Sequence, residues 1–135
     1  MAIAALITWV ITALGGFYML GTWIARGGVR GGTSRLPVPV IFGHLALAAI
    51  GLVVWITYVI TDTGALTWTA FGLLVPVAAL GFLMLARWIP VRRASAAAPT
   101  GPAERHFPVA VVIGHGLAAL VTVVLVLLTA LGIGG

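Results

Sequence analysis

The sequence predicts an all-helical membrane protein with four transmembrane helices in one bundle. Of its 135 residues, 62% are hydrophobic and only 7% are charged, whereas a soluble domain carries roughly a quarter charged residues. Four apolar stretches are each long enough to cross a bilayer, which takes about 20 residues. They cover residues 3–25, 38–60, 66–88 and 107–131. Only three connections and two short tails remain, so we expect a single transmembrane domain over residues 1–135.

The first span is predicted to be a retained helix rather than a signal peptide. It has no basic region before it, its apolar run is too long, and no convincing cleavage site follows. The chain contains no cysteine. This excludes disulfides, thiolate zinc sites, iron–sulfur clusters and covalent c-type haem attachment.

The charge pattern predicts how the chain is oriented in the membrane. All seven basic residues are arginines, and they lie in or beside the first and third connections. The second connection carries Asp62 and no basic residue. The positive-inside rule then puts the first and third connections in the cytoplasm and both termini outside, in a cell's inner (plasma) membrane. The net charge of +5 is therefore a topology signal and does not indicate a nucleic-acid partner, and the arginines are placed to contact anionic membrane lipid.

An internal repeat connects the spans. Residues 36–49 (LPVPVIFGHLALAA) and 107–120 (FPVAVVIGHGLAAL) share a Pro, a Gly and a His at a shift of 71 residues. Residues 16–23 (GFYMLGTW) and 81–88 (GFLMLARW) agree at a shift of 65. We expect a tandem helical-hairpin repeat, residues 1–64 and 65–135, related by a pseudo-two-fold axis along the membrane normal.

The repeat places two histidines at equal depth. His44 and His115 each follow the proline that starts their helix by seven residues, or about 10 Å along the axis, in the cytoplasmic half of the bilayer. A histidine inside a membrane is costly and usually functional. Helices related by a central axis would turn the two imidazoles toward each other, as bis-histidine ligation of a haem iron requires.

The neighbouring residues suit a flat ligand. Small residues around each histidine would give a macrocycle room, and the cytoplasmic arginines would meet its propionates. The second nitrogen of each ring is expected to bond a backbone carbonyl one turn back on its own helix. The predicted cofactor-binding residues besides the histidines are Gly43, Gly114, Ala48, Gly51, Ala119, Arg35 and Arg105.

Other roles remain open for the histidines. They could form hydrogen bonds between helices for stability alone, or serve a proton, a quinone or another metal. His106, at the cytoplasmic mouth of the fourth span, is expected to be interfacial, or to serve a quinone or a proton if a quinone binds near the haem.

The remaining polar and aromatic residues are predicted to have structural roles. Trp23, Trp88 and Trp68 are expected at the membrane boundaries, and Trp9 and Trp55 in the same belt or in packing. Asp62 is expected to cap the third span, Pro76 to kink it, and Asp62 and Glu104 to lie near the surface.

Four helices with one histidine on each of two of them resemble the small membrane b-type cytochromes: the cytochrome b561-like proteins and the haem-carrying anchors of respiratory dehydrogenases. Many of those carry four histidines and two haems, whereas His44 and His115 imply at most one haem b. The lysine-free composition also resembles that of small four-helix membrane proteins of actinobacteria.

The resemblance implies a non-catalytic electron-transfer or accessory subunit working between a partner and the menaquinone or quinone pool. Other membrane subunits or a second copy are its expected partners. The alternatives are a haem-free structural or assembly subunit of a larger membrane complex, and a small transporter or channel.

Overall fold

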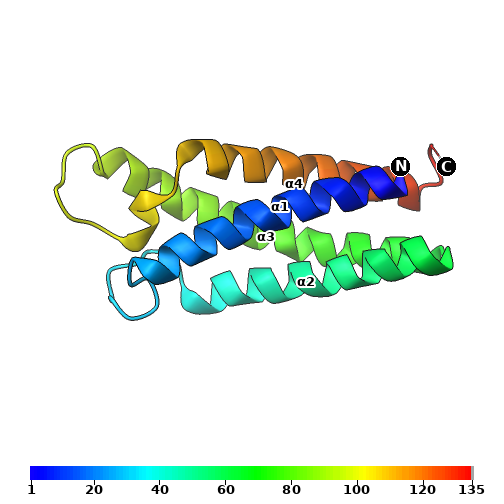
Figure 1. Cartoon of the computed structure of the whole chain (residues 1–135), viewed down its shortest axis with the longest axis horizontal. Helices are drawn as coiled ribbons and strands as arrows, with labels where there is room; N and C mark the ends of the chain where they lie inside the picture. Colours follow the sequence, from blue (N-terminus) through cyan, green and yellow to red (C-terminus); the bar gives the residue numbers. More distant parts are fainter. Residues whose placement is uncertain (135) are drawn as a thin grey trace.

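The chain folds into four long helices, as the sequence predicts. A computed structural model describes residues 1–134. The helices are α1 (Ala2–Ala25), α2 (Val38–Thr61), α3 (Ala65–Ala94) and α4 (Val109–Ala130), with a short 3-10 turn, η1 (Ala103–His106), before α4 (Figure 1). All four are long and apolar enough to span a membrane. The prediction of a four-helix transmembrane bundle is confirmed.

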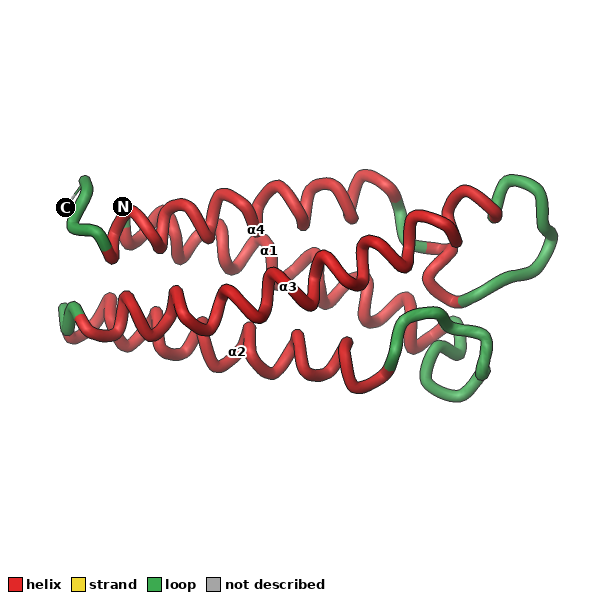
Figure 2. The backbone as a smooth tube through the Cα atoms, turned by 180° about the vertical axis from the view of Figure 1, so that it is seen from behind, coloured by secondary structure: helices red, strands yellow, loops and turns green. Residues whose placement is uncertain are grey.

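The helices run up and down in chain order, which gives the bundle two distinct ends. Both termini and the short turn after α2 lie at one end, called here the termini end (Figure 1). The two longer connections, after α1 and after α3, lie at the opposite end, called the loop end (Figure 2). This arrangement agrees with the predicted topology, in which the arginine-bearing connections share one side of the membrane.

The helix boundaries follow the predicted spans closely except at the end of α3. The predicted third span stops at Trp88, but α3 continues to Ala94, with Pro76 and Pro90 inside it. Arg87, Arg92 and Arg93 lower the hydropathy of this end, so hydropathy alone misses the last turns. Those turns carry two arginines, which form helix readily and interact favourably with its C-terminal end.

Matched residues begin α2 and α4. Pro37 and Pro108 are their N-caps, both in extended conformation, with ψ of 131° and 128°. The opposite end of α2 closes at Asp62, whose φ of 52° is left-handed and whose backbone N–H donates to Tyr58. The predicted capping of α3 by Asp62 is wrong: the N-cap of α3 is Gly64, with no side-chain cap.

The four helices pack as two close pairs. α1 packs mainly on α4, and α2 packs mainly on α3. A two-fold operation that exchanges α1 with α3 and α2 with α4 turns one pair into the other, so this pairing agrees with the repeat. The two histidine-bearing helices, α2 and α4, are therefore diagonal neighbours.

Two apolar clusters fill the bundle, one toward each end. Apart from Ala103, residues within each cluster correspond to one another at the repeat shifts of 65 or 71. The termini-end cluster contains Ala5, Ala70, Trp9, Leu74, Trp55 and Val126. The loop-end cluster contains Trp23, Trp88, Leu36, Phe107 and Ala103.

Most of the tryptophans belong to these clusters. Trp23 is 1% exposed and Trp88 is 8% exposed, so their rings pack inside the protein, and their predicted level at the membrane boundary stays a prediction. Each indole N–H has a partner inside the protein: Trp23 donates to Ser34 Oγ at 2.9 Å and Trp88 to the Glu104 carbonyl at 3.1 Å. A buried indole usually requires such a partner. Trp68 is half exposed, as a boundary residue would be.

Glu104 joins the two connections at the loop end. Its side chain is completely buried, which contradicts the predicted surface position. One carboxylate oxygen accepts from the Ser34 hydroxyl at 2.9 Å, and the other from the Arg35 backbone N–H at 2.6 Å. A carboxylate can be buried when its oxygens are bonded in this way, and these bonds hold η1 against the α1–α2 connection.

Candidate functional site

The section of the bundle between the two clusters is packed less tightly than the clusters themselves. None of residues 10–18 of α1, 42–50 of α2, 78–83 of α3 and 113–121 of α4 is buried, although many of them are partly buried. The residues that follow toward the loop end, among them Met19, Ile41 and Met84, pack on the loop-end cluster. We call this section the histidine layer, because it contains both His44 and His115.

The two imidazole rings are neighbours within the histidine layer. Their centroids lie 6.3 Å apart, with an angle of 52° between the ring planes. The rings come from the diagonal helices α2 and α4, one from each helix pair. The predicted juxtaposition of His44 and His115 is therefore present in the structure.

Each ring is held by a backbone carbonyl of the neighbouring helix in its pair. Nδ1 of His44 bonds the Val77 carbonyl of α3 at 2.9 Å, and Nδ1 of His115 bonds the Thr12 carbonyl of α1 at 2.8 Å. Because a carbonyl can only accept, Nδ1 carries the proton and Nε2 keeps its lone pair. The prediction of a carbonyl on the same helix is wrong, since each ring reaches sideways to the adjacent helix.

A glycine lets each ring approach its carbonyl. Within an α-helix the Thr12 carbonyl pairs with the N–H of Gly16, and the Val77 carbonyl with that of Gly81. A Cβ at Gly16 would lie 3.3 Å from Cε1 of His115, and one at Gly81 would lie 3.5 Å from Cε1 of His44. A larger side chain at either position would therefore push against the ring.

Sequence reasoning had the signal for these supporting residues but did not use it. Gly16 and Gly81 are matched in the GFYMLGTW and GFLMLARW segments, and Thr12 and Val77 have the same shift of 65 residues. The match by itself indicates only a repeat. A carbonyl acceptor also has no sequence signature, because every residue carries one.

The Nε2 nitrogens face accessible space. Within residues 1–134, Nε2 of His44 and of His115 makes no hydrogen bond. In the same range, no buried side-chain nitrogen or oxygen lacks a partner. The two Nε2 atoms are therefore accessible, and each has a lone pair free for a ligand.

The small residues predicted to bind the cofactor do not all lie in the histidine layer. No atom lies within 4 Å of a Cβ built on Gly114, and Gly43 has only a Leu80 methyl at 4.0 Å. Ala48 and Ala119 are partly exposed within the histidine layer. Gly51 instead lies under the indole of Trp9, which would be 3.0 Å from a Cβ there, so its small size makes room for the termini-end cluster.

The predicted polar residues lie at the loop end, beyond the loop-end cluster. The Arg105 guanidinium donates to the carbonyls of Ser95 and Ala98, at 3.4 and 2.9 Å, and so holds its own connection. His106 is exposed, and its Nδ1 lies 3.2 Å from the Ala103 carbonyl. Arg35 lines a surface depression with Arg87. A contact of Arg35 or Arg105 with a propionate, and of His106 with a quinone, stays a prediction.

The histidine pair could hold a metal that brings further ligands of its own. Among residues 1–134 no group of three or more His, Cys, Asp or Glu side chains could hold a metal ion. Two imidazoles alone are a small donor set for a bare divalent cation, which usually takes four or more ligands. They are the complete axial set for a metal already held in a macrocycle.

A comparison of the chain with protein-family models, with curated proteins and with solved structures found no match.

Proposed function

We propose that this protein is a membrane b-type cytochrome in which His44 and His115 hold one haem iron from opposite faces. The observation that carries the proposal is the pair of rings 6.3 Å apart, each with an accessible Nε2, inside a layer with no buried residue. With metal–nitrogen bonds of about 2.0–2.1 Å, two imidazoles in line across a metal have centroids about 6.4 Å apart. The observed distance between the ring centroids is close to that value.

The remaining contacts of each ring favour ligation. A ligating histidine usually donates its other N–H to a carbonyl or carboxylate, which fixes the tautomer and makes the ligating nitrogen more basic. Val77 and Thr12 supply that carbonyl for His44 and His115. The glycines at positions 16 and 81 keep the rings close to these carbonyls.

The haem would supply one-electron transfer when bound, while the protein supplies its ligands and surroundings. Apolar clusters on both sides of the histidine layer limit the access of water, and this burial is one of the means by which a protein adjusts a haem potential. The protein would act in the plasma membrane, with the loop end in the cytoplasm. It would pass electrons between a partner subunit and the quinone pool, as an accessory rather than a self-sufficient enzyme.

One observation favours a second candidate, a haem-free structural or assembly subunit. Both Nδ1 bonds join neighbouring helices, and such bonds stabilise membrane bundles by about 0.6–2 kcal/mol each without any ligand. On this view the accessible Nε2 atoms have no partner of their own, and the histidine layer meets lipid or another subunit.

Absorption spectroscopy separates the two candidates. The full chain, purified in detergent and loaded with haem, should show a Soret band and sharp α and β bands after dithionite reduction. The His44→Ala and His115→Ala variants should each lose the bis-histidine spectrum. His106→Ala is the matched control, since this third histidine lies outside the histidine layer, and its spectrum should be unchanged. If the wild-type chain takes up no haem, the cytochrome proposal is wrong and the structural or assembly role is the remaining candidate.

A further inference from the structure

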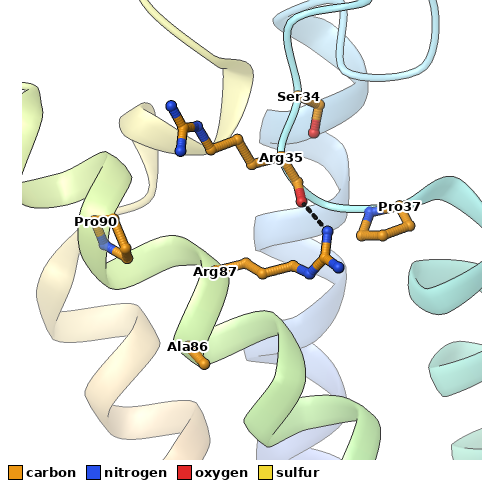
Figure 3. A pocket seen from close by; sticks show the side chains of 6 residues that line it. All are labelled: Ser34, Arg35, Pro37, Ala86, Arg87 and Pro90. Carbon is orange, nitrogen blue, oxygen red and sulfur yellow. Dashed lines mark hydrogen bonds between the residues drawn. The ribbon is translucent and has the colours of Figure 1, made fainter.

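A depression at the loop end has the features of an anion site. It has a volume of about 540 Å³ and lies between the start of α2 and the end of α3. Its polar wall consists of Ser34, Arg35 and Arg87, and its apolar wall of Pro37, Ala86 and Pro90 (Figure 3). Two of the six lining residues are arginines, which gives the depression a basic character.

The Arg87 side chain is anchored there with donors to spare. Its Nη1 donates to the Arg35 backbone carbonyl at 3.2 Å, while the Arg35 guanidinium points away from that contact (Figure 3). A guanidinium has five N–H donors. One bond therefore orients Arg87 and leaves most of its donors for a ligand.

Neither arginine has an acidic partner. The whole chain has only two acidic residues. Asp62 lies at the termini end, and the two oxygens of Glu104 accept from the Ser34 hydroxyl and the Arg35 backbone N–H. The Glu104 carboxylate thus places one negative charge beside the two arginines, and the remaining excess of positive charge at the depression favours an anionic ligand.

The depth of the depression matches lipid phosphate. Arg87 follows the first residue of α3 by 22 positions, which is about 33 Å along a helix, close to the ~30 Å thickness of the bilayer hydrocarbon. The guanidinium therefore lies at the level of the headgroups, with Ala86 one position nearer the bilayer centre and Pro90 nearer the loop end.

The other repeat lacks this arrangement. At the shifts of 65 and 71, Arg87 corresponds to Thr22 and Arg35 to His106. The equivalent surface of the α1–α4 pair therefore has no arginine at either position. The two basic residues are specific to the α2–α3 pair and are not a by-product of the repeat.

We propose that the depression lined by Arg35 and Arg87 binds the phosphate of an anionic phospholipid in the leaflet at the loop end. Arg87 would give directional bonds to the phosphate oxygens and Arg35 would add charge, since guanidinium groups match phosphate geometry. The site is separate from the histidine layer and does not depend on haem.

Native mass spectrometry of the full chain in detergent tests this. Titration with phosphatidylglycerol should give one tightly retained lipid, and phosphatidylcholine with the same acyl chains should be retained far less. A basic residue near an anionic lipid is worth about fivefold in binding, so Arg35→Gln and Arg87→Gln should each weaken retention about fivefold and the double variant more. Arg87→Lys keeps the positive charge but loses the planar guanidinium with its paired N–H donors. Its lipid retention should lie between that of wild type and that of Arg87→Gln.

Two control variants distinguish a specific lipid site from general electrostatic attraction between the protein and anionic lipid. Arg92→Gln and Arg93→Gln remove the same charge from exposed positions at the same end and should leave retention unchanged. Equal losses in all four single variants would overturn the proposal. Displacement of the lipid by millimolar inorganic phosphate would also overturn it, because the ligand would then be a soluble anion. Haem absorbance, recorded on the same samples, reports separately on the histidine pair.

Discussion

The termini-end cluster and the histidine layer are built from the same four helices in opposite ways. In the cluster the repeats have diverged, so that Trp9 in one corresponds to Leu74 in the other and Trp55 to Val126. Large residues are thereby offset against small ones, which fills the interior. In the histidine layer the repeats keep the residues at the histidine pair, with Gly16 matched to Gly81 and His44 to His115, and nothing is buried. Divergence between the repeats thus accompanies close packing in the termini-end cluster, whereas the residues at the histidine pair are the same in both repeats.

Filling the histidine layer should have the largest effect. Gly16→Leu places a branched side chain where even a Cβ would be 3.3 Å from the His115 ring. We expect complete loss of haem uptake, measured by the Soret absorbance of the purified chain. Gly21→Leu is the matched control on the same helix, because nothing lies within 4 Å of a Cβ at Gly21. If both variants kept the spectrum, the open layer would not be the binding site.

Emptying the termini-end cluster should affect stability most strongly. Trp55 is 0% exposed, and replacing a buried tryptophan with alanine typically costs about 3–5 kcal/mol. Trp55→Ala should lower the free energy of unfolding by that amount in a denaturant titration in mixed micelles. Trp68→Ala, at a half-exposed position, should change it by no more than about 0.5 kcal/mol. Similar losses in the two variants would mean that the cluster does not carry the stability.

The buried carboxylate should have an intermediate effect. Glu104→Gln keeps the shape but can no longer accept from both Ser34 and the Arg35 N–H, and an unsatisfied buried polar group costs about 1–3 kcal/mol. We expect a lower thermal midpoint, followed by circular dichroism. Asp62→Asn changes the other carboxylate, tolerates the left-handed backbone there, and should leave the midpoint unchanged. An unaltered midpoint in Glu104→Gln would show that the two connections are held by other contacts.

The smallest effect is expected at the hydrogen bond between Thr122 and Thr8, two hydroxyls 2.9 Å apart that join α4 to α1. Thr122→Val should cost about 0.6 kcal/mol, the average for such bonds in a membrane protein. Thr57→Val is the comparison, since that hydroxyl bonds only the Val53 carbonyl of its own helix. A double-mutant cycle with Thr8→Val measures the pair directly, and a coupling near zero would contradict this estimate.

The fold was predictable because the membrane restricts it so strongly. Backbone groups in lipid must bond within the chain, so an apolar run of sufficient length becomes a helix. The end of α3 was not predictable from hydropathy, because its last turns carry arginines outside the apolar run. The burial of Glu104 and Trp88 was also missed, since both depend on partners supplied by a different connection or helix.

The candidate site was predictable only in part. The repeat indicated that His44 and His115 lie at one depth, and the structure brings their rings together. The Thr12 and Val77 carbonyls needed the helix pairing, which sequence alone left open. The repeat suggested two hairpins, whereas the closest contacts are between α1 and α4 and between α2 and α3.

The pairing of α1 with α4 and of α2 with α3 has a consequence for the order in which contacts form during synthesis and folding. The bond from His44 to Val77 spans 33 positions and joins two consecutive helices, α2 and α3, whereas that from His115 to Thr12 spans 103 and joins α4 to α1. Contacts between distant segments form late because a long loop must close first. The second imidazole therefore reaches its partner only after α4 has left the ribosome and entered the bilayer. Cofactor capture by both rings would thus require α4, and a polypeptide interrupted before α4 would present only one of the two nitrogens.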